Sequence, residues 1–200
     1  MQNFMIECLD PKTGKSGKYW VSRSVAVVGF IFCKDQKGKW YVLANQRGNN
    51  APDFKHHWNC VCGYLDYDEN ANEAIKREVW EETGLDILRH TFIPYFVNSS
   101  KYENRQNVTI RFYNILNGDI TKWSNFSFEN NEPGEVANIR WIAIDDIDEY
   151  TWAFDHDAII KDVYDTFINI SWWKRYIINK YHKMVTFKFM KKLMLNDEEK

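Results

Sequence analysis

The order of apolar and polar positions predicts two strands near the start of the chain. Residues 24–32 are β-branched and aromatic with no polar alternation, which is typical of a strand buried on both faces. Residues 40–46 predict a second strand, and the segment 35–38 between them, which ends in glycine, predicts a hairpin turn. Residues 48–52 contain glycine and proline and predict a loop, whereas residues 1–23 are mixed in pattern.

One central helix is predicted over residues 70–83, a stretch with no glycine or proline. Its apolar residues recur at helical spacing, namely Ala71, Ala74, Ile75 and Val79. Asp68 and Asn70 are both suitable N-caps, and Gly84 stands where a C′ glycine ends a helix. The helix therefore has a sequence signal at each end.

Three further strands and a second helix are predicted beyond the central helix. The strand-like segments are residues 92–97, 108–116 and 139–144. Residues 159–168 carry apolar side chains at helical spacing and predict an amphipathic helix. Strands, a central helix, more strands and a final helix indicate a compact α/β domain with a mixed sheet.

Length and composition indicate one domain with terminal extensions. The 200 residues are 44% apolar and 16% aromatic, which is enough for a packed core. Lys and Arg number 26 against 28 Asp and Glu, and the net charge of −2 excludes a nucleic-acid binder driven by global charge. We expect an N-terminal extension at 1–23, a domain at 24–170 and a C-terminal extension at 171–200.

The sequence shows no membrane or export segment. The longest apolar run, residues 25–33, has nine residues, whereas a transmembrane helix needs roughly 20. The first five residues lack a basic region followed by an apolar one, so no secretory signal is visible. The four cysteines form no C-x-x-C pair, which is consistent with reduced thiols. The sequence therefore predicts a cytoplasmic protein.

Three carboxylates gather on one face of the predicted central helix. At 100° per residue, Glu82 lies about 40° from Glu78, and Glu81 lies about 60° to its other side. We expect no lysine or arginine on this face, so the like charges repel unless a divalent cation binds them. Oxygen ligands select hard cations, which predicts Mg²⁺ or Mn²⁺. A solvated acidic surface is the alternative.

Arg77 is the basic residue nearest to these carboxylates in the sequence. It lies about 100° from Glu78 around the helix, off the carboxylate face. Its side chain can reach back to Glu69 or to the loop that starts at Gly63. We therefore expect Arg77 to form a structural ion pair rather than to bind a metal.

The spacing of these residues resembles the signature of the Nudix hydrolases. That signature is G-x5-E-x7-R-E-U-x-E-E-x-G-U, in which U is a bulky aliphatic residue. This chain matches it at Gly63, Glu69, Arg77, Glu78, Val79, Glu81, Glu82, Gly84 and Leu85. The resemblance covers roughly residues 22–170. It implies an α/β/α sandwich, with the signature as a loop–helix–loop, and hydrolysis of a nucleoside diphosphate linked to another moiety.

The resemblance also implies roles for the signature residues. It makes Glu78, Glu81 and Glu82 metal ligands and catalytic residues. The Gly63 carbonyl is an occasional metal ligand in the family, so Gly63 is counted with Arg47 among the substrate-binding candidates. Glu69 and Arg77 correspond to the family's structural pair. The expected substrate is a nucleotide-type small molecule, and the expected cofactor is Mg²⁺ or Mn²⁺.

Two further candidates lie outside the signature. Many family members use an additional acid from a loop before a late strand, and here Glu132 and Glu135 precede residues 138–144. We favour Glu135 as the acid that accepts a proton from water, with a solvated loop acid as the alternative. Arg47 ends the second predicted strand, where an arginine in relatives often faces the substrate or packs near the signature loop. A surface arginine is the alternative there.

Two rival functions follow from other features. Residues 58–63 also resemble isopentenyl-diphosphate isomerase, a Nudix-fold enzyme with a reactive cysteine at the position of Cys62. The complete signature and the presence of Tyr64 in place of a metal-binding histidine count against that function. A non-catalytic ligand sensor is the second rival. The intact acids and the short segment after the domain count against the sensor.

The C-terminal extension has a charge pattern of its own. Residues 171–195 contain seven basic and no acidic residues, whereas residues 1–170 carry a net charge of −7. The first half of the extension has the apolar spacing of an amphipathic helix. We expect it to pack on the domain or to support a homodimer. Binding to a membrane surface or to nucleic acid is the alternative.

Overall fold

The computed structural model describes residues 4–10, 13–100, 107–170 and 180. The chain divides into two units, residues 1–156 and 157–200. Helix α2 (His156–Val163) begins at the boundary and continues into a π-helical turn, Tyr164–Ile168, which confirms the helix predicted there. The C-terminal extension, for which the sequence predicts a helix and a role in a homodimer, lies outside the described residues apart from Lys180.

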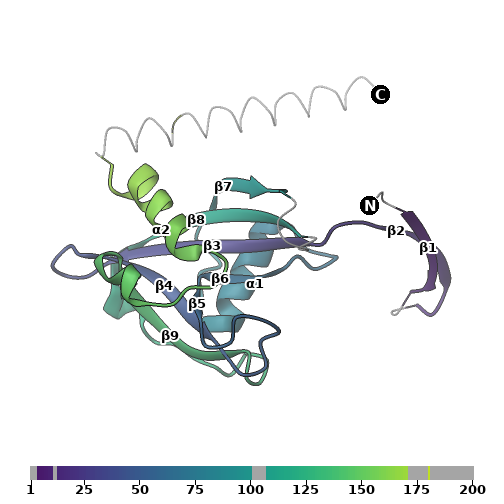
Figure 1. Ribbon diagram of the computed structural model, residues 1–200, viewed down its shortest axis with the longest axis horizontal. Coiled ribbons are helices and arrows are strands. Elements are labelled where there is room, and N and C mark those ends of the chain that lie inside the picture. The colour runs from purple at the N-terminus through teal and green to yellow at the C-terminus, as the bar shows by residue number, and fades with distance from the viewer. Residues whose placement is uncertain (1–3, 11–12, 101–106, 171–179, 181–200) are drawn as a thin grey trace. The chain divides into compact units, whose positions relative to one another are not determined.

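The first unit is organised around a mixed sheet of seven strands among the described residues (Figure 1). The strands are β3 (Val25–Lys34), β4 (Trp40–Arg47), β5 (Trp58–Asn59), β6 (Val61–Tyr64), β7 (Ile93–Asn98), β8 (Val108–Asp119) and β9 (Val136–Ala143). Their main order is β5-β4-β3-β8-β7, with β6 paired to β3 and β9 paired to β4. The β3–β8 pair is parallel and the other pairs are antiparallel, so the predicted mixed sheet is confirmed.

Strand β3 lies at the centre because it is apolar on both faces. Val27, Phe30, Ile31 and Phe32 are fully buried, and the strand pairs with β4, β6 and β8. A strand with neighbours on both edges and side chains buried on both faces needs the unbroken apolar run seen in the sequence. The turn that follows is held by Asp35, whose Oδ1 accepts hydrogen bonds from two backbone N–H groups.

Helix α1 (Ala71–Thr83) begins and ends at the residues that the sequence predicts. Asn70 is its N-cap and forms a capping box with Glu73, which decides between the two N-caps that the sequence offers. Gly84 closes the helix in the left-handed conformation, with φ of 73°, and donates its N–H to the Trp80 carbonyl. The cap residues are local, so the sequence alone could locate both ends.

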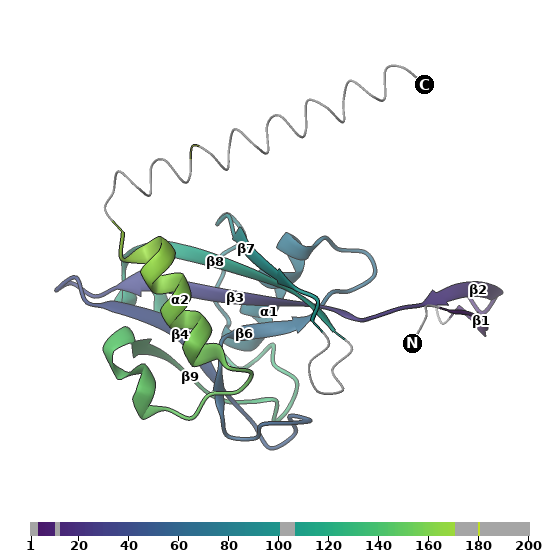
Figure 2. The same cartoon turned by 45° about the horizontal axis from the view of Figure 1, so that its top comes forward.

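Helix α1 packs on one face of the sheet against β3 and β6 (Figure 2). A side chain at Gly29 would lie 2.9 Å from the Ile75 side chain, so the glycine in β3 lets the helix approach closely. Val27, Ile75 and Val79 are fully buried in the cluster between helix and sheet. Their burial fixes the rotation of α1, and with it the direction of the signature carboxylates.

Some elements were not predicted from the pattern. Residues 1–23, described above as mixed, contain a hairpin of β1 (Phe4–Leu9) and β2 (Ser16–Val21). Short strands β5 and β6 lie in a segment for which the pattern predicted no strand. The 3₁₀ turns Ile120–Trp123 and Ile144–Glu149 follow β8 and β9.

A search of the described residues found no helix that is long and apolar enough to cross a bilayer.

Candidate active site

The signature loop meets helix α1 at Gly63. Gly63 pairs with Val27 in the β3–β6 ladder, and its α-carbon faces the Glu78 carboxylate. A side chain at position 63 would overlap that carboxylate, so the first glycine of the signature is required by close approach. The contact brings the end of β6 and the middle of α1 together at one point.

Arg77 joins the loop to the helix through Glu69. Its Nε and Nη2 donate to the two Glu69 oxygens at 3.0 and 2.7 Å, and Nη2 also donates to the Tyr64 carbonyl at 2.9 Å. This bidentate pairing is the strong geometry for arginine and carboxylate. The Arg77 guanidinium lowers the pKa of Glu69, whose second contact is the backbone N–H of Asp66.

Arg77 also contacts the carboxylate face, and here the expectation from helix geometry was wrong. Its Nη1 donates to Glu78 and to Glu81, each at 2.8 Å. The angle of about 100° describes the α-carbons, whereas the long arginine side chain extends one helical turn toward the C-terminus and reaches Glu81. Arg77 therefore offsets part of the repulsion between the signature carboxylates when no other cation is bound.

Glu82 is the most buried signature carboxylate, with 5% of its surface exposed. The Asn45 side-chain amide and the backbone N–H of Cys62 donate hydrogen bonds to it. Burial, and after it the nearby Glu78 and Glu135 carboxylates, raises the pKa of Glu82 well above its ordinary value. The hydrogen bonds favour the charged form but do not balance the loss of water.

Glu78 is held in a similar environment beside Gly63. Burial raises the pKa of Glu78 to about 7, while Arg77 opposes the shift and Glu81 adds to it. A carboxyl group with this pKa is protonated more readily near neutral pH than an ordinary glutamate, and a bound cation would favour its charged form. Titratable groups with such strongly shifted pKa values gather at functional sites more often than elsewhere.

Glu135 lies on the other side of these carboxylates, in the loop before β9. Its carbonyl accepts the Gly48 N–H at 2.6 Å, and Asn50 Nδ2 donates to the Pro133 carbonyl at 2.6 Å. These bonds tie the loop after β4 to the loop before β9. Partial desolvation and then the nearby Glu132 raise the pKa of Glu135. The Glu135 charge is felt at both Glu78 and Glu82.

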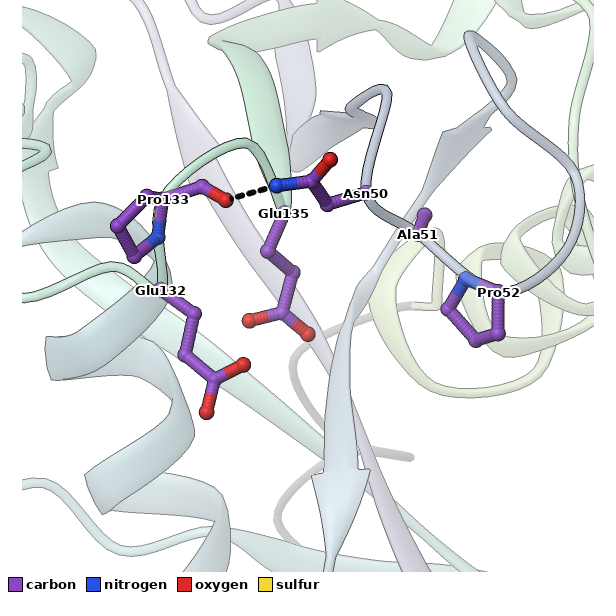
Figure 3. Close-up of a pocket in the computed structure, with 6 residues that line it drawn as sticks. All are labelled: Asn50, Ala51, Pro52, Glu132, Pro133 and Glu135. Carbon is purple, nitrogen blue, oxygen red and sulfur yellow. Dashed lines mark hydrogen bonds between the residues drawn. The ribbon is translucent and has the colours of Figure 1, made fainter.

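The two loops enclose a pocket of about 390 Å³ (Figure 3). It is lined by Asn50, Ala51, Pro52, Glu132, Pro133 and Glu135. The Glu132 and Glu135 carboxylates extend from one loop, while Asn50 reaches across to Pro133. The pocket therefore adjoins the acid that the sequence singled out before β9.

Arg47 ends β4, one residue before the glycine that contacts Glu135. Its Nη2 and Nε donate to the Asp53 carboxylate and carbonyl at 2.7 and 2.9 Å. Its guanidinium also lies 5.0 Å from the centre of the Phe154 ring. The Arg47 charge lowers the pKa of Glu135 against the effect of desolvation. Arg47 is thus anchored within its own loop and lies within electrostatic reach of the acids.

Cys62 lies next to Gly63 and is half-buried. Burial raises the pKa of its thiol to about 12, and Glu82 adds to the shift. Asn59 Nδ2 donates to Cys62 Sγ at 3.3 Å and to the Cys60 carbonyl at 2.9 Å. His156 supports the same loop, because its Nδ1 accepts the Cys60 N–H at 3.0 Å. The Cys62 thiol is therefore protonated at neutral pH.

Sequence reasoning missed two buried asparagines at this site. Asn45 and Asn59 face each other in the β4–β5 ladder, and each is 2% exposed. Their signal in the sequence is a polar residue at the end of a buried stretch, such as Asn45 after Val42, Leu43 and Ala44. Pairing across strands is a property of the fold, so no local motif revealed them.

The donor chemistry of the site fits a hard divalent cation. Glu78, Glu81 and Glu82 offer carboxylate oxygens, the ligands that Mg²⁺ and Mn²⁺ prefer. In the described part of the chain, no three His, Cys, Asp or Glu side chains already form a group that could hold a metal ion. Instead, the Arg77 guanidinium holds Glu78 and Glu81. Arg77 occupies one oxygen of each carboxylate, Oε1 of Glu78 and Oε2 of Glu81, which leaves the other oxygen of each for a cation.

A scan against protein-family models matches residues 23–163 to the NUDIX domain. The chain belongs to the Nudix family. This domain is that of a hydrolase acting on phosphoric anhydrides, which agrees with the family that the signature indicated.

Two curated relatives support the assignment. An 8-oxo-dGTP diphosphatase of Buchnera aphidicola subsp. Schizaphis graminum is 28% identical over 140 residues, covering 68% of this chain and 90% of the relative. Nudix hydrolase 19, chloroplastic, of Arabidopsis thaliana is 39% identical over 46 residues. That match covers 22% of this chain, and the chain spans only 10% of the length of the Arabidopsis protein.

Solved Nudix structures share the fold. The NUDIX domain of Shewanella oneidensis NrtR, complexed with ADP ribose, has a TM-score of 0.57 at 20% identity and covers 78% of this chain. The match spans 92% of that domain. The Nudix hydrolase RenU of M. smegmatis has a TM-score of 0.52 at 14% identity, covering 80% of this chain and 92% of its own. At these identities the likeness extends to the Nudix fold.

Proposed function

We propose that this Nudix domain hydrolyses a nucleoside diphosphate linked to another moiety, with Mg²⁺ or Mn²⁺ as its cofactor. The observation that supports this best is the convergence of Glu78, Glu82 and Glu135, whose pKa values are all raised. Glu78 and Glu82 are buried, and carboxylates in such mutual proximity are stabilised when a divalent cation lies among them. The same cation attracts a pyrophosphate, which brings its own negative charge to the site.

Residues at different positions in the site would have different roles in the reaction. Glu78, Glu81 and Glu82 would hold the cation, which when bound neutralises phosphate charge and makes water a better nucleophile. Glu135 would accept the proton of the attacking water, because its carboxylate adjoins the pocket and is only partly desolvated. Arg47 would contact the phosphates from the end of β4 by giving up part of its bonding to Asp53.

The experiment that tests this function is a substrate screen with each metal. The panel should contain nucleoside diphosphate sugars, ADP-ribose, dinucleotides, dinucleoside polyphosphates and nucleoside triphosphates. The name of the Buchnera relative adds 8-oxo-dGTP to the panel. We expect turnover of at least one member with Mg²⁺ or Mn²⁺ and none in EDTA. Turnover of no member with either metal would reject the proposal.

The screen also separates the two rival functions. A ligand sensor would bind a panel member without hydrolysing it, which calorimetry detects. An isomerase-like enzyme would leave every phosphoric anhydride intact and convert isopentenyl diphosphate instead. Each rival therefore gives a result that the hydrolase does not.

A further inference from the structure

Asn45 occupies a place in β4 that favours an apolar residue. It pairs with Asn59 of β5 on one side and with Ile139 of β9 on the other, so its backbone is held from both edges. Only 2% of its surface is exposed. Its Oδ1 is buried without a hydrogen-bond partner among the described residues. A buried amide with an unpaired acceptor is unfavourable for folding, so stability alone does not account for an asparagine here.

The other end of the Asn45 amide has a specific contact. Its Nδ2 donates a hydrogen bond to Oε2 of Glu82, across 37 residues of sequence. Glu82 needs such a contact more than the other signature acids do. Arg77 forms ion pairs with Glu69, Glu78 and Glu81, whereas Glu82 has none among the described residues. A residue of the sheet, Asn45, therefore donates a hydrogen bond to Glu82, whereas a residue of the helix, Arg77, donates to the other signature acids.

We propose that Asn45 is a positioning residue, which acts through Glu82 by holding its carboxylate in the orientation that binds the cation. This inference rests on the proposed function, in which Glu82 is a metal ligand. Helix α1 sets the backbone of Glu82, but its side chain has three rotatable bonds between backbone and carboxylate. A donor from β4, a strand paired along both edges, fixes the carboxylate and lowers the entropy lost when the ion binds.

The test measures binding of Mn²⁺ alone to the full chain, by electron paramagnetic resonance without substrate. We expect Asn45→Ala to raise the Mn²⁺ dissociation constant on the order of 10-fold, as is usual when the partner of a metal ligand is lost. Asn114→Ala is the matched control. Asn114 is also an asparagine in the sheet, and 5% of its surface is exposed. Its Nδ2 donates a hydrogen bond to the Thr91 carbonyl, and its Oδ1 has no partner among the described residues. It should change thermal stability but not Mn²⁺ affinity.

A double-mutant cycle shows whether the effect passes through Glu82. In the Glu82→Gln background, Asn45→Ala should change Mn²⁺ affinity by less than about twofold, because the carboxylate ligand that Asn45 orients is already absent. A second full 10-fold loss in that background would overturn the proposal. So would an Asn45→Ala protein that binds Mn²⁺ like the wild type.

Two controls keep the outcomes separate. If Asn45→Ala does not fold, Asn45→Ser offers a smaller cavity and a hydroxyl too short to reach Glu82 directly, and the same affinity loss is expected. A wild-type protein that binds no Mn²⁺ would contradict the proposed function itself. Normal wild-type binding with unchanged binding in both Asn45 variants would contradict only the role of Asn45.

Discussion

The carboxylate of Glu78 lies against the α-carbon of Gly63, at the place where a side chain would project. Gly63→Ala should therefore push Glu78 aside. We expect Gly63→Ala to lose about 1–3 kcal/mol of stability from overpacking and to lose more activity than a core variant of similar stability. Gly29→Ala is the control, since it crowds Ile75 in the core instead. Denaturant unfolding and kcat per folded molecule would measure both. Equal activity in the two variants would contradict a role for the Gly63 contact in the site.

Glu82→Gln should separate activity from stability. Because Glu82 is buried next to Glu78 and Glu135, replacing its charge relieves a cost of the metal-free fold. We expect kcat to fall by several orders of magnitude, while Tm in EDTA holds steady or rises. Steady-state kinetics and thermal unfolding test the two halves. Near wild-type activity would show that Glu82 is not a metal ligand.

The metal-free protein should lose stability as the pH rises from about 4.5 to 7. The folded-state pKa of Glu78 is about 7 against an ordinary value of 4.5, so the folded state binds more protons than the unfolded state in this window. The free energy of unfolding should fall there by on the order of 2 kcal/mol, and the raised pKa values of Glu82 and Glu135 act in the same direction. Urea unfolding in EDTA measures it. Glu78→Gln should reduce the slope, and an unchanged slope would contradict this origin.

Glu135→Gln should lower kcat while leaving Mn²⁺ binding nearly unchanged, if Glu135 accepts a proton rather than binds the metal. A reduction of roughly 100-fold or more is the usual effect of losing a general base. Glu132→Gln, from the same pocket wall, is the matched variant and should keep most of the activity. Should Glu132→Gln be the impaired variant, the choice between the two acids was wrong.

Cys62→Ala distinguishes hydrolase from isomerase-like chemistry. The thiol is protonated at neutral pH, and its contact is with Asn59, so the hydrolase needs it only for packing. We expect folded Cys62→Ala protein to keep its hydrolase activity and to lose on the order of 1 kcal/mol of stability. Activity assays on protein shown to be folded by circular dichroism provide the check. Complete loss of turnover would favour the cysteine-dependent alternative.

Local sequence was sufficient for the elements whose determinants lie close together in the chain. The capping box of Asn70 and Glu73, the left-handed Gly84 and the unbroken apolar run of β3 each act within a few residues. The signature is also local, because one helix carries all three of its metal-binding candidates. Helix geometry placed these carboxylates on one face without knowledge of the rest of the fold.

Only the tertiary structure decided what surrounds those carboxylates. The bond from Asn45 to Glu82 and the close approach of Glu135 depend on strand pairing between distant segments. The reach of Arg77 onto Glu78 depends on a side-chain conformation that helical angles do not describe. The chain pattern reports which faces are apolar, and it carries little information about which polar groups meet across the sheet. The shifted pKa values and the pocket result from contacts between polar groups of distant segments, so they exist only in the folded protein.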